Sequence, residues 1–471
     1  MLASIRDQYD EAMKAACNRR CCGPGSAPRQ RSHIAQHQRS HVLAVAAWAL
    51  SAACVTAPGP TPTPARPAAE AGSSAAASPS AAPRRAEALY VPPSDYDFSR
   101  NPALLARVTG SAHGYFRFVN SAFGRAVCSR FAPTVDSMPL VNLHGDAHVE
   151  QYAVTSSGRG LTDYEDATSG PAVVDLARFG VSLRLACEQR GWSGCAQPSL
   201  DEFLRGYRAA LYNPGLRAPE PSLVGRLRAA SKRTHHDLLI WADSLMVPMA
   251  TGRAELETDF GRYVEQARST QPDLPPDFFR IKRVGAHHLG VGSALQEKYL
   301  FRVEGPTEAA ADDVILELKE VRALGGVGCV TADSSADPTR IALGRARIAD
   351  LPFRYFGYVK RHGRMFWVHE WVEHYQEFNI QKTPQSPRDL HELAYDVGVQ
   401  LGRGHPNQLD SGANPDIRRR QLAALDAIEP ELRRAVEDLA ADATRSWRRF
   451  RTAVGASPTV PAASPSSPAE P

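Results

Sequence analysis

The chain has 471 residues, of which 43% are hydrophobic and 23% charged, with 34 Gly, 36 Pro and 8 Cys. These proportions exclude a collagen, a small disulfide-rich scaffold and a wholly disordered chain, and the length allows about two or three globular units. The formal net charge is +4, but residues 1–90 carry ten Lys and Arg against five Asp and Glu, so the rest of the chain is almost neutral. A neutral body lacks a polybasic surface for phosphates, which argues against nucleic acid as a partner.

The N-terminal segment has the pattern of a secretory signal. Residues 42–53 are an unbroken run of small apolar residues that follows basic residues and precedes Cys54. The run is shorter than the roughly 20 apolar residues that span a bilayer, but it has the length of a signal-peptide hydrophobic region. Because Ser51, Ala52 and Ala53 resemble a bacterial lipobox, we expect residues 1–54 to be an extension and lipoprotein signal peptide, with Cys54 lipidated. The alternative is an Ala-rich run of no function.

Two segments have the composition of disordered chain. Residues 55–88 and 453–471 consist largely of Ala, Pro, Ser, Thr and Gly, which bury too little apolar area to offset chain entropy. The first would tether a folded body to a membrane. We therefore expect a membrane-anchored lipoprotein facing the periplasm or exterior, which meets the membrane only through its lipid; the alternative location is cytoplasmic.

The stretch from Pro139 to Ala177 carries the densest group of reactive residues. An apolar, strand-like run, Leu140–Leu143, leads into a loop, and an acidic cluster follows it. The candidate site residues of the loop and the cluster are His144, Asp146, His148, Asp163 and Glu165. Two carboxylates on neighbouring loops could divide phosphoryl transfer, one orienting or deprotonating an attacking hydroxyl and the other holding Mg²⁺ on the phosphates. The alternative is a buried His and Asp that satisfy turn amides, beside a solvated acidic loop.

The HGDAH run at residues 144–148 resembles the HGDxHxxN catalytic loop of aminoglycoside and choline phosphotransferases. DYEDATSGPAVVDLA, which begins at Asp163, resembles their metal-binding segment. The resemblance implies that Asp146 is the catalytic base, that Asp163 is the principal magnesium ligand, with Glu165 and Gln151 as further ligand candidates, and that Asp175 braces the catalytic loop. The metal-binding asparagine of that family falls on Gln151 here, whose amide oxygen stands on an arm one methylene longer.

The body of the chain retains an even number of cysteines: Cys128, Cys187, Cys195 and Cys329. An even number suits an oxidising compartment, and Cys187 and Cys195 are close enough in sequence to pair. Four unrelated thiols are the alternative.

Residues 281–320 predict three strands and a glycine-rich turn. Strand-like runs end near Val284 and in Tyr299–Val303, and a third, Val314–Leu318, delivers Lys319. The turn between the first two contains Gly290, Gly292 and Ser293. Glycines let backbone amides approach phosphate oxygens, and a lysine on the third strand can reach the same phosphates. The alternative for the turn alone is an ordinary hairpin.

Other residues near these runs have plainer interpretations. Glu320 would point to the face opposite Lys319, so no glutamate partner of that lysine can be placed. We expect His287 and His288 to be solvated loop histidines, and His235 and His236 to begin a helix. The aromatic residues of 353–371 alternate as in a strand and favour a core over a nucleobase platform.

The remaining chain predicts two strands and then helices. Arg354–Val372 reads as two strands around a His-Gly turn, followed by a hinge at Glu373–Glu377. Asp389–Gly404 has apolar residues at helical spacing, and Ile417–Arg451 should form long helices with solvated charged faces.

The catalytic loop thus precedes the glycine turn and the lysine, the reverse of the usual kinase order. This order predicts an α+β, protein-kinase-like, two-lobed fold in circularly permuted form, which is feasible where domain termini lie close together. A mainly helical lobe would span 89–275, a small antiparallel-sheet lobe 276–375, and completing helices 376–452.

The whole pattern resembles an uncharacterised bacterial domain-of-unknown-function family that carries GDxHxxN near its start and GxGS…LKE later. The resemblance covers about residues 95–410 and includes an aromatic-Arg segment at residues 116–118. We expect Arg117 to brace a helix; the alternative is that it contacts phosphate.

The expected function is a kinase-like phosphotransferase. It would move a phosphoryl, or a nucleotidyl, group from ATP or another nucleoside triphosphate with Mg²⁺ to a small-molecule or protein acceptor, as a monomer. The alternative is a catalytically silent kinase-like binding module tethered to the membrane. A periplasm offers little ATP, and Gln151 in place of asparagine also favours the catalytically silent module. The phosphotransferase is favoured by the presence together of Asp146, Asp163, Asp175 and Lys319.

Overall fold

The computed structural model describes residues 87–156, 158–231, 234–288, 296–331, 336–350, 354–407 and 414–455. All of these residues belong to one unit of the chain, His41–Pro471. The expected signal peptide with Cys54, most of the linker, most of the tail, and the turn with Gly290, Gly292 and Ser293 lie outside the described residues.

The fold is mixed α+β, with more helix than strand. The helices of the described residues are α3 (Pro102–Gly110), α4 (Ala112–Phe118), α5 (Asn120–Arg130), α6 (Ala132–Val135), α7 (Val173–Gln189), α8 (Ala196–Tyr212), α9 (Ser222–Ala230), α10 (His235–Leu245), α11 (Arg253–Thr270), α12 (Thr339–Ile348), α13 (Pro387–Gly404) and α14 (Asn414–Ala453). As expected, α10 begins at His235, whereas residues 417–451 form part of one helix of 40 residues rather than several.

The strands form three small antiparallel sheets. One pairs β1 (Leu140–Leu143) with β4 (Thr168–Pro171), and the second has the order β10 (Gln376–Glu377), β2 (Tyr152–Val154), β3 (Arg159–Leu161). The third has the order β5 (Ile281–Ala286), β6 (Lys298–Val303), β7 (Val314–Glu320), β9 (Arg364–Trp371), β8 (Gly357–Arg361). The predicted strands at 140–143, 281–318 and 354–372 are confirmed, and the predicted His-Gly turn lies between β8 and β9, where His362 and Gly363 both have positive φ.

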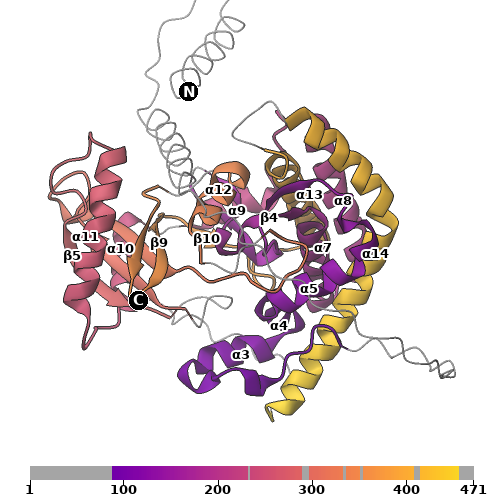
Figure 1. The fold of residues 1–471 in the computed structure, drawn as a ribbon, viewed down its shortest axis with the longest axis horizontal. Coiled ribbons are helices and arrows are strands. Elements are labelled where there is room, and N and C mark those ends of the chain that lie inside the picture. The colour runs from indigo at the N-terminus through magenta and orange to yellow at the C-terminus, as the bar shows by residue number, and fades with distance from the viewer. Residues whose placement is uncertain are drawn as a thin grey trace, which may run out of the picture. The chain divides into compact units, whose positions relative to one another are not determined.

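The main core is helical. α7 lies at its centre, α8 and α13 pack side by side, and α14 runs along the outside of α7 (Figure 1). The α8–α13 contact needs glycine, because a Cβ at Gly398 would lie 2.2 Å from the Phe203 carbonyl oxygen and one at Gly402 would lie 2.4 Å from that of Tyr207. A side chain at either position would push the two helices apart.

Helix α13 confirms the predicted segment Asp389–Gly404 with a slightly earlier start. Ser386 and Asp389 form a capping box, and Pro387 occupies the first turn, where its missing N–H is not needed. Leu390, Leu393 and Val397 are fully buried in the helical core, as their spacing requires.

The five-stranded sheet is covered unequally on its two faces. On one face, Phe301, Leu316 and Phe366 pack against α11 in a continuous apolar cluster. On the other, α10 covers Leu300 and Ile315 near one end of the strands. The rest of that second face carries polar side chains, which include Lys319.

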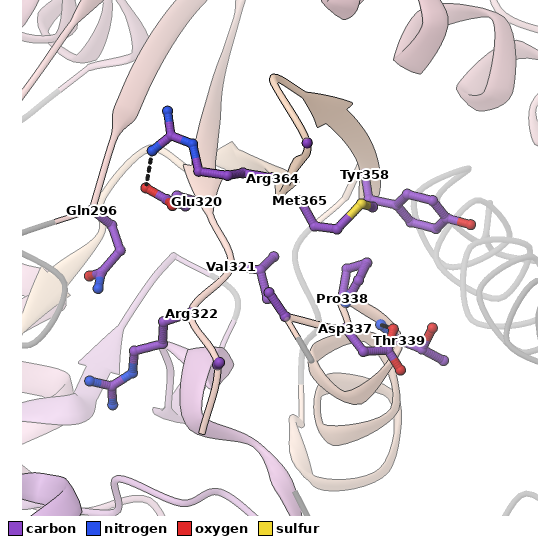
Figure 2. Close-up of a pocket in the computed structure, with 13 residues that line it drawn as sticks. Gln296, Glu320, Val321, Arg322, Asp337, Pro338, Thr339, Tyr358, Arg364 and Met365 are labelled. Atoms are coloured by element: carbon purple, nitrogen blue, oxygen red, sulfur yellow. Dashed lines mark hydrogen bonds and ion pairs between the residues drawn. The ribbon is translucent and has the colours of Figure 1, made fainter. Parts of the chain in front are cut away.

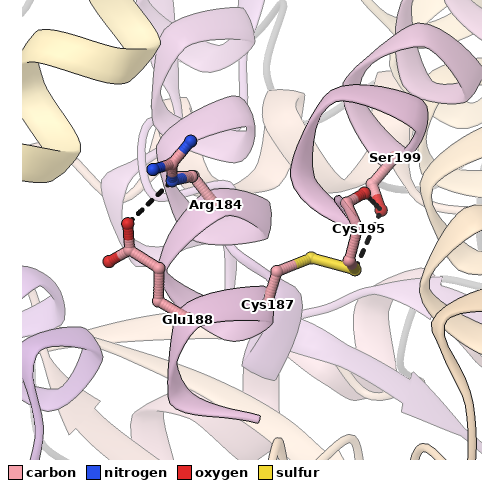
Figure 3. Close-up of a disulfide and its surroundings, with 5 residues drawn as sticks. All are labelled: Arg184, Cys187, Glu188, Cys195 and Ser199. Atoms are coloured by element: carbon pink, nitrogen blue, oxygen red, sulfur yellow. Dashed lines mark hydrogen bonds and ion pairs between the residues drawn. A yellow bond between two sulfur atoms is a disulfide. The ribbon is translucent and has the colours of Figure 1, made fainter. Parts of the chain in front are cut away.

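The chain returns from the sheet to the helical core along residues 321–331. Cys329 forms a disulfide with Cys128 of α5, and the Thr331 amide donates a 2.8 Å hydrogen bond to the Ser169 carbonyl of β4. A second disulfide joins Cys187 at the end of α7 to Cys195 at the start of α8 (Figure 3). The structure therefore pairs all four cysteines of the body. Helix α12 follows and packs on α13, β1 and β4, although it lies between sheet strands in sequence.

Among the described residues, no helix combines the length and the apolar character that crossing a bilayer requires.

Candidate functional site

The loop after β1 is held in place by Asp175 of α7. The Asp175 carboxylate is fully buried and accepts hydrogen bonds from the backbone amides of His144 (2.6 Å) and Gly145 (2.9 Å) and from His405 Nε2 (3.2 Å). Burial opposes ionisation, but the hydrogen bond and charge of His405 lower the pKa of Asp175 below its usual value. Gly145 has φ +80°, and a Cβ there would lie 1.9 Å from the Asp166 carbonyl oxygen, so the tight turn requires glycine.

The carboxylate of Asp146 lies in this turn and is 7% exposed. Its Oδ1 accepts hydrogen bonds from Arg178 Nε (2.9 Å) and Nη2 (2.6 Å). Burial raises the pKa of Asp146, and the charge of Arg178 acts against that rise. Arg178 is itself buried, lies 3.8 Å from the ring centroid of Phe116 and donates to the Phe116 carbonyl oxygen. Arg178 was not predicted from the sequence, although one arginine inside the apolar run of α7 is a signal of a buried ion pair.

Removing Arg178 should destabilise the protein strongly. Arg178→Met leaves the buried Asp146 without its cation, so we expect the free energy of unfolding to fall by about 3 kcal/mol in urea titrations at pH 7. The matched control is Arg184→Met on the same helix, where the arginine is 35% exposed in its ion pairs and the expected loss is below about 1 kcal/mol. Equal losses in the two variants would contradict a buried Asp146–Arg178 pair.

The two predicted histidines are both fully buried beside Asp146. His144 Nε2 donates to the Thr162 carbonyl oxygen at 2.8 Å, and its Nδ1 accepts from the Asp146 amide, so His144 orients the loop. His148 Nε2 lies 3.7 Å from Asp146 Oδ2, and neither ring nitrogen of His148 has a hydrogen-bond partner among the described residues. Burial lowers the pKa of His148 well below its usual value, so the ring is neutral at pH 7.

The acidic cluster meets Lys319 of β7. Lys319 Nζ lies 3.4 Å from Asp163 Oδ1 and forms an ion pair with Glu165. Asp163 adopts φ +59°, a left-handed conformation that costs free energy in residues other than glycine. Burial would raise its pKa, but the charge of Lys319 lowers it, whereas burial and the charge of Asp163 raise the pKa of Glu165 to about 8. The structure thus brings Lys319 to Asp163, 156 positions earlier in the sequence, and to the nearby Glu165.

Glu165 was expected among the magnesium ligands, and its nearest charged partner is instead Lys319. The backbone of Gln151 lies beside that of Thr162, the residue before Asp163, because the Thr162 amide donates a 2.9 Å hydrogen bond to the Gln151 carbonyl oxygen. In the part of the chain that the structure describes, no three His, Cys, Asp or Glu side chains have the geometry of a metal centre. Magnesium is commonly held by one or two carboxylates together with substrate phosphates, and the ionised Asp163 beside Glu165 fits that donor set.

Behind Lys319 lies a second polar group on the same sheet face. Lys298 is the cross-strand partner of Lys319, and Glu317 accepts hydrogen bonds from His369 Nε2 (3.0 Å) and Trp371 Nε1 (2.9 Å). The expectation of a solvated His287 is wrong: the ring is 2% exposed, and its Nε2 lies 3.1 Å from Glu317 Oε1. The burial comes from the β5–β6–β7 pairing, which places the end of β5 against Glu317.

Arg322 links the sheet to the loop that carries Asp146. It forms an ion pair with both carboxylate oxygens of Asp166, and Oδ2 also accepts a hydrogen bond from Asn120. Asn120 donates to the Gly145 carbonyl oxygen as well. Arg322 also lines a cavity of about 730 Å³. Figure 2 shows Arg364 and Glu320 paired at one side of this cavity and Tyr358 with the start of α12 at another. Glu320 therefore faces away from the acidic cluster, as predicted.

Arg117, in the last turn of α4, contacts Glu150 of the short helix Val149–Gln151 that follows the loop. Its Nη1 donates to Glu150 Oε2 at 2.9 Å, and the Ile380 amide donates to Oε1 of the same carboxylate. Burial opposes ionisation of Glu150, but the hydrogen bond from His113 and the charges of His113 and Arg117 lower its pKa to about 2.

This pKa predicts a pH-dependent stability. A carboxyl with a depressed pKa in the folded state stabilises above its unfolded pKa, near 4.5, and the contribution is lost as pH falls toward 2. Glu150→Gln should therefore lower the free energy of unfolding by about 3 kcal/mol at pH 7, and the difference from the wild type should shrink below pH 4.5. Urea titrations between pH 2.5 and 7 measure it, with the exposed Glu188→Gln as the control. A difference that does not change with pH would show that charge is not its cause.

The comparisons with known proteins identify the family of the chain. The family model described as an uncharacterized protein conserved in bacteria (DUF2252) matches residues 100–222 and 225–453. The match covers more than half of the chain, so the protein belongs to this family, and the expected domain-of-unknown-function family is confirmed. No curated protein and no solved structure matches the chain.

Proposed function

We propose that this protein is a kinase-like phosphotransferase whose two lobes occur in permuted order, and that the Lys319–Asp163–Glu165 contact is its nucleotide-phosphate site. That contact is the observation that carries the proposal, because it joins a buried lysine on the third strand of a sheet to the loop that follows the HGD motif. Such a pair positions phosphates and their metal in phosphoryl transfer.

In this proposal each side chain has a separate task. Asp146 accepts or orients the proton of the acceptor hydroxyl, and its raised pKa is the direction that a proton acceptor needs. Asp163, with Glu165 and Gln151 nearby, would hold Mg²⁺, which neutralises charge on the phosphates. Lys319 binds the phosphates, and Asp175 and Arg178 keep the Asp146 loop in place. ATP or another nucleoside triphosphate is the donor.

A single assay tests the chemistry. The full chain is incubated with Mg²⁺ and ATP, and the nucleotide products are separated by chromatography. ADP formation that is lost in Asp163→Ala supports phosphoryl transfer, whereas release of pyrophosphate with AMP attached to a product supports nucleotidyl transfer. No product with any nucleoside triphosphate or candidate acceptor would overturn the proposal.

A catalytically silent binding module is the second candidate, and two observations favour it. The paired cysteines support an oxidising compartment, and with the lipobox-like Cys54 they support a lipoprotein outside the cytoplasm, where little ATP is present. Gln151 replaces the expected metal-binding asparagine. Lipid labelling that is lost in Cys54→Ala would establish the anchor, and its absence would return the protein to the cytoplasm.

A further inference from the structure

Lys298 and Lys319 lie directly opposite each other on neighbouring strands. The β6–β7 register pairs Lys298 with Lys319, Leu300 with Glu317 and Arg302 with Ile315. Side chains at paired positions project from the same face, with Cβ atoms about 4.5–5.5 Å apart. Both ammonium groups therefore belong to the sheet face that meets Asp163 and Glu165.

This arrangement costs free energy. Lys298 is 3% exposed and Lys319 is 6% exposed, and like charges directly across two strands repel. Burial, and then the charge of Lys319, lower the pKa of Lys298 to about 8. Further along the same face, the residues under α10 are apolar, namely Leu300 and Ile315.

The acids around the two lysines differ in exposure. Glu165 forms an ion pair with Lys319, and its side chain is 11% exposed. The Asp163 side chain is 35% exposed and forms the open edge of the cluster, 3.4 Å from Lys319 Nζ. Glu317 contacts His287, His369 and Trp371 on the other side of Lys319.

We propose that Lys298 is a second phosphate-binding lysine, and that Lys298 and Lys319 together select ligands with at least two adjacent phosphate groups. The inference rests on the proposed function and deepens it, because it names the residue that separates di- and triphosphates from monophosphates. One phosphate contacts Lys319 at the exposed Asp163 edge, and the neighbouring phosphate contacts Lys298. Charge-assisted contacts to phosphate are the strong kind of hydrogen bond.

The test uses inorganic triphosphate, pyrophosphate and orthophosphate as probes, so that no base or acceptor is needed. Their dissociation constants are measured by calorimetry with the full chain at constant ionic strength. The wild type should bind triphosphate more tightly than orthophosphate. Lys298→Met should lower the ratio of the orthophosphate Kd to the triphosphate Kd by about tenfold or more, which corresponds to the loss of one charged hydrogen bond. Lys298→Arg should keep most of the preference, and Lys360→Met, an exposed lysine of β8, should leave it unchanged.

A purely structural Lys298 predicts a different result. Lys298→Met would then lower the melting temperature but keep the wild-type ratio of triphosphate to orthophosphate affinity, and that ratio would overturn the inference. If Lys298→Met does not fold, the same criterion applies to Lys298→Gln, which removes the charge but keeps a polar end on the side chain. An unchanged ratio in a protein that still turns over nucleotide leaves the proposed function standing, whereas a wild type that binds neither triphosphate nor nucleotide overturns both.

Discussion

Asp146→Asn is expected to lower the kcat of the proposed transfer by about 10²–10⁴-fold, the usual contribution of a positioned proton acceptor. The amide keeps the shape of the side chain and its place beside Arg178 and His148, but it cannot take the proton of the acceptor hydroxyl. Nucleotide affinity should change by less than about threefold, because in the proposed site the phosphates are held by Lys319 and, through Mg²⁺, by Asp163. Product formation and nucleotide binding are measured on the same preparation.

The control must separate chemistry from lost stability. Asp396 is also buried and accepts hydrogen bonds from an arginine, Arg159, and from Tyr152. Asp396→Asn should therefore reduce stability as Asp146→Asn does but leave kcat within about twofold. Comparable losses of kcat in both variants, or full activity in Asp146→Asn, would contradict the role of Asp146.

The disulfides are expected to differ in their effect on stability. Cys128 and Cys329 are separated by 201 positions and Cys187 and Cys195 by 8, so chain entropy gives about 5 kcal/mol for the first crosslink and about 2.5 kcal/mol for the second. The double variants Cys128→Ser/Cys329→Ser and Cys187→Ser/Cys195→Ser should lower the free energy of unfolding in that order. Urea titrations of the oxidised protein measure both losses.

The longer crosslink should also affect the site. Cys329 lies on the return segment from β7 to the helical core, together with Arg322 and Thr331, and this segment sets where Lys319 meets Asp163. Nucleotide affinity should therefore fall in Cys128→Ser/Cys329→Ser and not in Cys187→Ser/Cys195→Ser. Thiols that titrate fully in the unreduced, denatured protein would contradict both crosslinks.

Local patterns in the sequence predicted the elements that carry the site. The run at 140–143 is β1, the loop with Asp146 follows it, and Lys319 lies on β7 as expected. These features depend on alternation, turn residues and apolar spacing within a few positions, which a single sequence displays. Apolar spacing predicted α13 from Asp389, two residues after its start at Pro387, because the capping box of Ser386 and Asp389 was not used in that prediction.

Contacts between distant segments could not be predicted in the same way. His405 reaches Asp175 across 230 positions, and Cys329 reaches Cys128 across 201. His287 reads as a loop residue in sequence and is buried only because β7 brings Glu317 to it. Glu165 is equally informative: its residue type suggests a metal ligand, and only the fold shows that Lys319 is its partner.

The central claim is that Lys319 and Asp163 form a site for nucleotide phosphates, and a thermal-shift titration tests it most directly. The full chain is heated with Mg²⁺ and increasing concentrations of several nucleoside triphosphates, alongside Asp163→Ala, Lys319→Ala and the control Lys360→Ala. A ligand of the folded state adds about 2.7 kcal/mol at a hundredfold excess over Kd, so the melting temperature of the wild type and of Lys360→Ala should rise with nucleotide. The two site variants should show little or no rise. No shift with any nucleotide, or equal shifts in all four proteins, would contradict the claim.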